Sequence, residues 1–262
     1  VMNDALLSGN LQFAAEGVGP FTTLWAKTHG NIAVKGMSAM NAMPLYLTTR
    51  NPDVKTIKDF TDKDKIALPA VKVSIQAVTL QMAAAQAFGE NNAFKLDKLT
   101  VSMSHPQGEI AMLSGRGEVT AHLSSPPFQY QELKDKKVHL VFSSYDILGG
   151  PATFNVITAT TKFHDENPKT YKAFFDAFKE ATDWINTNKK DAAELYLRMS
   201  KDKRDNVDDI MAILNDPDIS YTLTPHNIMK YVDFMHKIGS IKIMPASWKE
   251  MFFETAQHLK GS

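Results

Sequence analysis

The sequence contains no cysteine among its 262 residues. This absence excludes disulfide bonds, a thiol nucleophile and cysteine metal ligands, and it is compatible with any cellular compartment. An excess of one charge is also lacking, because 29 lysines and arginines balance 29 aspartates and glutamates. With no block of basic residues, a nucleic-acid-binding surface and a polybasic membrane anchor are disfavoured.

Long apolar runs are missing too, since none approaches the roughly 20 residues that span a bilayer. No secretory signal peptide is recognisable, and the chain opens abruptly in a helical pattern, so we expect a mature or truncated product. Hydrophobic residues make up 44% of the chain and charged residues 22%. This composition is typical of one large globular domain or two small ones.

Common catalytic and metal-binding motifs are absent. There is no G-x-S-x-G elbow and no phosphate-binding G-x-x-x-x-G-K-[ST] loop, and Gly17-x-Gly19 lacks the third glycine of a dinucleotide fingerprint. None of the eight histidines has a partner at metal-ligand spacing on one element, which favours structural roles. We interpret His105 as a helix cap. His122 is the exception to watch, because it follows a predicted strand and lies beside the Ser124-Ser125 loop.

The stretch from Asn51 to Gly89 contains the clearest strand–loop–helix pattern of the chain, and we call it the organising stretch. Its Lys65–Leu68 segment predicts a buried strand, and a loop then leads to a helix over 74–88. Ser74 is a good N-cap for this helix, and Gly89 ends it. Strand, loop and helix start in this order present backbone N–H groups and a positive dipole end to a small ligand.

Similar alternation through the first 160 residues predicts an α/β fold with a mainly parallel sheet. After residue 165 the pattern is mostly helical. The other predicted strands are 11–15, 31–37, 43–50, 99–104, 119–123, 138–142 and 153–160, and the other predicted helices before the tail are 3–8, 21–27, 106–114 and 128–133.

The pattern divides into two lobes. The first lobe is discontinuous, comprising 1–43 and 152–262, and the second lobe, 44–151, is inserted into it. Two connections between the lobes predict a cleft and a hinge. Three strand-to-helix junctions are candidate ligand loops, because ligands bind at the carboxyl ends of strands in open α/β sheets, although any α/β protein has such loops. They are Glu16–Phe21, Pro69–Gln76 and Leu123–Phe128.

An ordered set of short motifs resembles a known family. It comprises Gly17-Val18-Gly19-Pro20, Thr56-Ile57-Lys58-Asp59-Phe60, Leu113-x-Gly115-x-Gly117-x-Val119, Ser125-Pro126 and Phe163-x-x-Glu166-Asn167-Pro168. The chain resembles the solute-binding proteins of ABC importers of the nitrate/sulfonate/taurine type, with their thiamine-precursor pyrimidine-binding relatives.

This resemblance implies a two-lobed periplasmic-binding-protein-like fold of type II, with a helical C-terminal tail packing on the first lobe. It implies a periplasmic monomer without catalysis, cofactor or metal, which captures a small organic anion or heteroaromatic between its lobes and docks on a permease of the inner membrane. Carried over by position, the ligand-binding candidates are Gly17, Val18, Gly19, Pro20, Ser38, Lys72, Ser74, Ile75, Gln76, His122, Ser124 and Ser125.

Two departures from the family pattern matter. Family members usually begin with a further strand and helix, so we expect the first lobe to lack them. The second-lobe loop of sulfonate binders is rich in glycine and serine, whereas here it reads Ala70-Val71-Lys72-Val73-Ser74. This loop leaves less room for the backbone to surround an oxyanion, so aromatic and pyrimidine solutes remain candidate ligands.

Two alternatives share the fold. Pyrimidine-synthesising relatives are enzymes that bind a pyridoxal-type cofactor, and Lys72 or Lys35 would be the Schiff-base candidate here. A ligand-sensing lobe pair of a regulator or receptor is the other alternative.

Overall fold

The computed structural model describes residues 2–262, and they form two compact units. The first unit comprises residues 2–42, Ala152–Lys201 and Leu214–Ser262, and the second comprises Met43–Pro151 and Asp202–Ile213. The chain therefore passes between the units at four places, two more than the sequence predicts. Residues 202–213, expected in the first lobe, belong to the second unit.

The first unit contains a three-stranded sheet in the order β1-β8-β2. Its strands are β1 (Ala14–Gly17), β8 (Thr153–Thr160) and β2 (Val34–Ala42), and β8 runs antiparallel to both neighbours. The expectation of a mainly parallel sheet is therefore wrong for this unit. The reason is that the central strand, β8, comes from the segment that returns from the second unit and runs against the two earlier strands.

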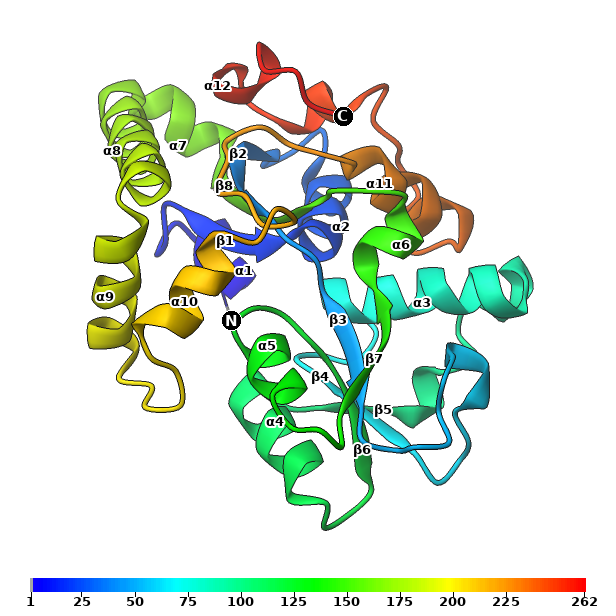
Figure 1. Cartoon of the computed structure of the whole chain (residues 1–262). Coiled ribbons are helices and arrows are strands. Elements are labelled where there is room, and N and C mark those ends of the chain that lie inside the picture. Colours follow the sequence, from blue (N-terminus) through cyan, green and yellow to red (C-terminus); the bar gives the residue numbers. More distant parts are fainter. Residues whose placement is uncertain (1) are drawn as a thin grey trace. The chain divides into compact units, whose positions relative to one another are not determined.

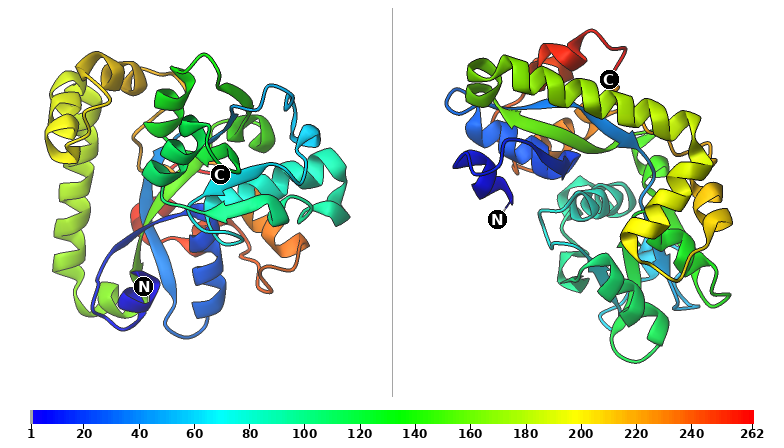
Figure 2. Two further views of the ribbon diagram at one scale, coloured as in Figure 1. Left: turned by 90° about the horizontal axis from the view of Figure 1, so that it is seen from below. Right: turned by 90° about the vertical axis from the view of Figure 1, so that its left-hand side faces the viewer.

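Helices cover this sheet (Figure 1). One core cluster packs Tyr171 of α8 against Met37, Ile157 and Ala159 of the strands, and Figure 2 shows α8 lying alongside the first unit's sheet. The longer helices are α2 (Val18–Thr28), α8 (Pro168–Thr187), α9 (Lys189–Ser200) and α11 (Ile228–Lys237), and the shorter ones are α1 (Met2–Leu7), α7 (Thr161–Glu166), α12 (Glu254–Gln257) and the 3-10 turn η4 (Trp248–Met251).

The second unit contains a five-stranded mixed sheet in the order β5-β4-β6-β3-β7. Its β4 is parallel to both β5 and β6, whereas β3 is antiparallel to β6 and β7. The parallel prediction is thus correct for its β4 core. The strands are β3 (Tyr46–Thr49), β4 (Lys65–Leu68), β5 (Thr100–Ser102), β6 (Val119–Ser124) and β7 (His139–Ser143).

The organising stretch folds as predicted. The strand β4 covers Lys65–Leu68, and α3 runs from Ile75 to Phe88 with Ser74 as its N-cap and Gly89 as its C-cap. Figure 1 shows α3 and α4 on opposite sides of the second unit's sheet. The unit's other helices are α4 (His105–Ser114), α5 (Phe128–Leu133), α6 (Ser144–Leu148), α10 (Val207–Leu214) and the 3-10 turns η1 (Ile57–Asp59), η2 (Glu90–Asn92) and η3 (Asp97–Leu99).

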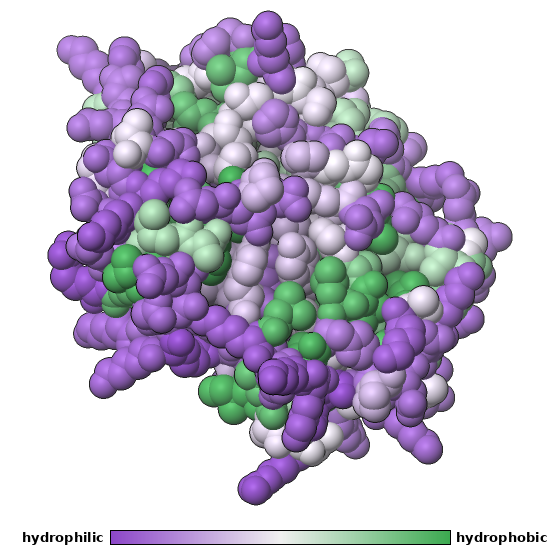
Figure 3. All heavy atoms as spheres, viewed as in Figure 1, coloured by the Kyte–Doolittle hydropathy of each residue, from purple (hydrophilic) through white to green (hydrophobic). Residues whose placement is uncertain are grey.

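The fold is thus mixed α/β in two units, as predicted. Within residues 2–262, no helix combines the length and apolar character that a membrane crossing requires. The face in Figure 3 is mostly hydrophilic, with small hydrophobic patches between the charged side chains.

Candidate functional site

The carboxyl ends of three parallel strands, β5, β4 and β6, lie at one edge of the second unit's sheet. Each strand leads toward a helix, and two of these helices begin with a serine cap. The Oγ of Ser74 accepts from the N–H of Ala77 at 3.2 Å, and Ser104 forms a capping box with Gln107 at the start of α4. The edge therefore carries helix N-termini and short polar side chains, which suits a small polar ligand.

A buried histidine lies at the centre of this edge. His122, near the end of β6, is fully buried, and its Nδ1 is 2.5 Å from Oε1 of Glu132 on α5, whose side chain is also fully buried. Its other ring nitrogen, Nε2, is 3.0 Å from Nδ1 of His105. Both ring nitrogens are thus occupied, so His122 does not itself contact a solute in this conformation.

The second carboxylate oxygen of Glu132 is also engaged. Its Oε2 accepts a hydrogen bond from Thr48 Oγ1 at 2.6 Å and another from Ser124 Oγ at 3.3 Å. A buried carboxylate normally requires such partners, because desolvation penalises its charge.

The network continues outward through His105, the first residue of α4. Its Nε2 is 3.3 Å from the amide nitrogen of Gln76 on α3. Burial, with a smaller electrostatic contribution from the neighbouring His122, lowers the pKa of His105 to about 3, so His105 is neutral at physiological pH. Sequence analysis interpreted His105 as a cap, but the cap of α4 is Ser104, and His105 links two elements instead.

Gly108 makes room for this network. A β-carbon at this position would lie 2.9 Å from Nε2 of His122 and 3.1 Å from Cβ of Ala67. Only a glycine lets α4 approach β6 and β4 this closely without displacing the His122 ring.

Three ligand-binding candidates of the second unit belong to this one network: Gln76, His122 and Ser124. Ile75 and Ser125 are buried near it, with 3% and 6% of their surface exposed. Lys72 lies apart. It is exposed, at a positive φ of 68°, and its charge lowers the pKa of Asp97 against the dominant effect of burial, which raises that pKa.

In the first unit, the predicted glycine-rich loop is shorter than expected. Val18, Gly19 and Pro20 form the first turn of α2, and only Gly17 lies outside the helix, as its N-cap. The helix starts early because proline is tolerated within a first turn, where backbone N–H groups lack intrahelical acceptors anyway. Ser38 on β2 is fully buried, and its Oγ has no hydrogen-bond partner among residues 2–262.

Glu16, one residue before Gly17, is a second notable group of this unit. It is 4% exposed, and its Oε1 accepts from Thr158 Oγ1 at 3.0 Å, whereas its Oε2 has no partner within the described chain. Burial raises the pKa of Glu16 to about 7, despite hydrogen bonds from Thr158 and Asn3.

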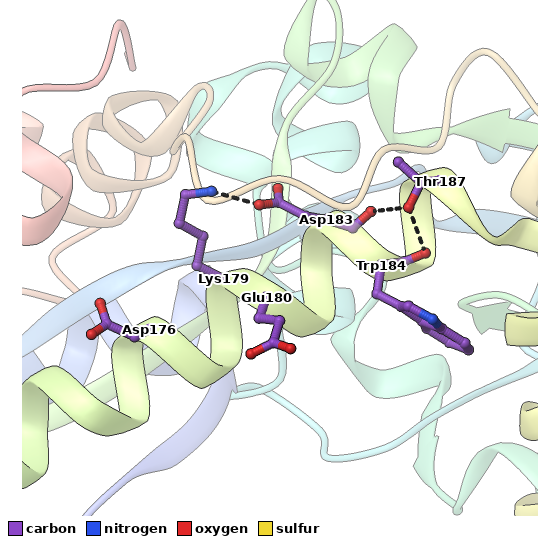
Figure 4. A pocket seen from close by; sticks show the side chains of 6 residues that line it. All are labelled: Asp176, Lys179, Glu180, Asp183, Trp184 and Thr187. Atoms are coloured by element: carbon purple, nitrogen blue, oxygen red, sulfur yellow. Dashed lines mark hydrogen bonds and ion pairs between the residues drawn. The ribbon is translucent and has the colours of Figure 1, made fainter.

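Two surface hollows lie on the first unit, away from these junctions. The larger, of about 420 Å³, follows one face of α8, with side chains that lie along a single helix and bond mostly to each other (Figure 4). The smaller, of about 300 Å³, is lined by Thr23, Ala26 and Lys27 of α2 and by residues 240–243. Neither contains a sequence-predicted site residue.

Metal binding finds no support in the part of the chain that the structure describes, where no three His, Asp or Glu side chains are grouped to hold an ion. Glu132 and His105 are the network members that sequence reasoning missed as partners of His122. A usable signal was available: His105 and His122 each lie where a parallel strand ends or a helix begins, and such positions meet at one edge of a sheet.

Comparison with known proteins identifies the family. Residues 1–199 match the NMT1-like family. This protein belongs to the NMT1-like family. Among curated proteins, none matches the sequence.

Solved structures share the fold at low sequence identity. The periplasmic aliphatic sulphonate binding protein SsuA of Escherichia coli is 17% identical, with a TM-score of 0.69, and the alignment covers 100% of this chain and 81% of SsuA. The alkanesulfonate-binding protein SsuA of Xanthomonas axonopodis pv. citri, bound to MOPS, is 14% identical with a TM-score of 0.69, covering 93% and 80%.

A conserved Candida albicans gene product is similar to the same degree, with 14% identity, a TM-score of 0.69 and coverage of 98% and 84%. It is described as showing the generic periplasmic binding protein fold. The family and the periplasmic-binding-protein fold expected from the sequence are therefore confirmed.

Proposed function

We propose that this member of the NMT1-like family captures a small organic anion or heteroaromatic, as the extracytoplasmic solute-binding protein of an ABC importer. It acts without catalysis, as a monomer in the periplasm, and delivers the solute to a permease of the inner membrane. The polar edge of the second unit carries this proposal. There the starts of α3 and α4 lie beside the buried network of Gln76, His105, His122 and Glu132.

Two of the similar solved structures are sulfonate-binding proteins, which supports this proposal. The chemistry of the edge supports a polar solute of modest size. The first N–H groups of α3 have no intrahelical acceptors, and Ser74 satisfies that of Ala77, leaving donors for an acceptor group of the solute.

The arrangement also argues against nucleophilic catalysis at this edge. His122 is fully buried with both ring nitrogens occupied, and His105 is held neutral with its Nε2 facing Gln76. Lys72, the Schiff-base candidate, is exposed rather than desolvated, whereas such lysines are activated by burial.

A thermal-shift screen tests the proposal. Purified protein is melted with taurine, alkanesulfonates, nitrate, aminopyrimidines, aromatic carboxylates and pyridoxal phosphate. A solute at about 100 times its dissociation constant stabilises the folded state by roughly 2.7 kcal/mol. At this size we expect the melting temperature to rise by very roughly 5 °C. The proposal fails if a cooperatively melting protein shifts with none of these solutes.

Matched variants of α3 make the screen specific. Gln76→Leu removes the polar side chain at the proposed site, and Gln86→Leu makes the same change near the other end of the helix, where Gln86 donates to the carbonyl of Ile147. We expect the shift to be reduced or lost in the first variant and kept in the second.

A further inference from the structure

The buried hydrogen-bond network of the second unit has two chemically different ends. At the inner end is the Glu132 carboxylate, which can only accept hydrogen bonds while ionised. At the outer end, Gln76 turns its amide nitrogen, which can only donate, toward Nε2 of His105. Between them lie two imidazole rings, each of which donates at one nitrogen and accepts at the other when neutral.

These ends impose one direction on the whole chain of hydrogen bonds. Because Gln76 donates, Nε2 of His105 must accept, and the proton of this neutral ring lies on Nδ1. That proton points at Nε2 of His122, 3.0 Å away, which therefore accepts. The proton of His122 then lies on Nδ1 and is donated to Glu132 at 2.5 Å. Donor faces acceptor at every step.

This direction of the hydrogen bonds fixes the orientation of the Gln76 side-chain amide, with its nitrogen toward His105 and its carbonyl oxygen on the side away from His105. Its Nε2 is held by His105, and only 3% of the residue's surface is exposed, so packing holds the amide in place. A flip of the amide would set its oxygen against the accepting Nε2 of His105. Its carbonyl oxygen accepts no hydrogen bond from any residue in 2–262.

We call the chain of hydrogen bonds from Gln76 through His105 and His122 to Glu132 the relay. We propose that the relay makes Gln76 an obligate hydrogen-bond acceptor for the solute. The protein then selects solutes carrying an N–H donor, such as an aminated heteroaromatic, over isosteres without one. The inference rests on the proposed function, in which Gln76 contacts the solute. His105, His122 and Glu132 are positioning residues, because each acts on the solute only through Gln76.

Matched pairs of solutes test the selection by calorimetric titration of the full chain. The pairs are 4-aminopyrimidine with 4-methylpyrimidine, and taurine with 1-propanesulfonate, and in each pair a methyl group replaces the amino group. One hydrogen bond to a buried acceptor predicts a preference of about 10-fold for the donor-bearing member of the pair that binds. Equal affinities, or a preference for the member without the donor, overturn the inference and leave solute binding standing. If neither pair binds, both the inferred selectivity and the proposed solute classes are contradicted.

The relay itself has a readout that needs no solute. Nitrogen-15 NMR of the free protein reports which ring nitrogen of each histidine carries the proton. We expect Nδ1 to be protonated and Nε2 unprotonated in both His105 and His122. A proton on Nε2 of His105 means that the relay runs the other way, and it overturns the inference whatever binds.

Variants of Gln76 connect the two measurements. Gln76→Glu places an acceptor-only carboxylate against His105, so the His105 proton is expected on Nε2, whereas Gln86→Glu on the same helix leaves it on Nδ1. Gln76→Leu removes the acceptor and is expected to abolish the 10-fold preference within a pair, whereas Gln86→Leu keeps it. A preference that survives Gln76→Leu contradicts the assignment.

Discussion

His122 and Glu132 are both fully buried, and Nδ1 of the one lies 2.5 Å from Oε1 of the other. Ten residues separate them, with β6 holding the histidine and α5 the glutamate. Replacing Glu132 by alanine removes the acceptor of His122 and of Thr48 together. We expect a loss of roughly 2–6 kcal/mol in the free energy of unfolding, because two buried donors are left without an acceptor at about 1–3 kcal/mol each.

Urea denaturation measures this loss. Glu118→Ala is the control, because Glu118 is an exposed residue of the same unit, and we expect its effect to stay within about 0.5 kcal/mol. Equal stabilities of the Glu132 and Glu118 variants would show that the buried pair contributes nothing to the fold.

Gly108→Ala separates two opposite effects. In an exposed helix position the change from glycine to alanine stabilises by about 0.5–1 kcal/mol. At Gly108, however, the new methyl group would meet Nε2 of His122 at 2.9 Å. Overpacking of this kind typically costs about 1–3 kcal/mol, so we expect a net destabilisation in urea titrations. A more stable variant would mean that α4 can move away from His122 freely.

Glu16 predicts how stability depends on pH. Burial raises the pKa of Glu16 in the folded protein to about 7, from an ordinary value of 4.5. Between these two values the folded state keeps a proton that the unfolded state has lost, so the free energy of unfolding falls as pH rises through this window. The accumulated loss above pH 7 is roughly 3 kcal/mol.

Glu16→Gln removes this titration and keeps an oxygen to accept from Thr158. We expect the variant to match the parent protein near pH 4.5 and to be more stable above pH 7, in denaturant titrations at several pH values. An unchanged pH profile would contradict the assignment of the raised pKa to Glu16, and Glu118→Gln controls for the change in net charge.

Arg204 holds the segment 202–213 to the rest of the second unit. Its guanidinium pairs with the buried carboxylate of Glu109 and with Asp202, and it lies 5.5 Å from the ring centre of Phe128. Arg204→Ala leaves Glu109 buried without its cation, so we expect a loss of roughly 2–4 kcal/mol and faster amide exchange in α10. Arg198→Ala, at an exposed position of α9, should change neither. If α10 keeps its protection without Arg204, other contacts hold the segment.

The sequence allowed the local elements to be predicted where local signals agree. Ser74 and Gly89 bracket α3, and both act as its caps in the structure. The start of α2 was misplaced, because Gly19 and Pro20 are typical of turns and nothing local shows that they continue the helix. The antiparallel course of β8 in the first unit is a property of its pairing with β1 and β2, which residue patterns do not encode.

The site was predictable only in part for a similar reason. Gln76, His122 and Ser124 were candidates because of their positions at strand ends and helix starts, and the structure joins them in one network, whereas their contact with a solute stays a prediction. Glu132 was missed because a single carboxylate on a short helix normally faces solvent, and only tertiary packing shows that it is buried against His122. Contacts between residues far apart in sequence follow from the fold.

The central claim is that this protein binds one small solute reversibly. Isothermal titration calorimetry of the purified chain with the solute classes of the thermal screen tests it most directly. The account predicts saturable binding of one solute per chain by one chemical class, weakened in Gln76→Leu and unchanged in Gln86→Leu. If the folded protein binds none of these solutes, or if the two variants bind equally well, the account of the site is contradicted.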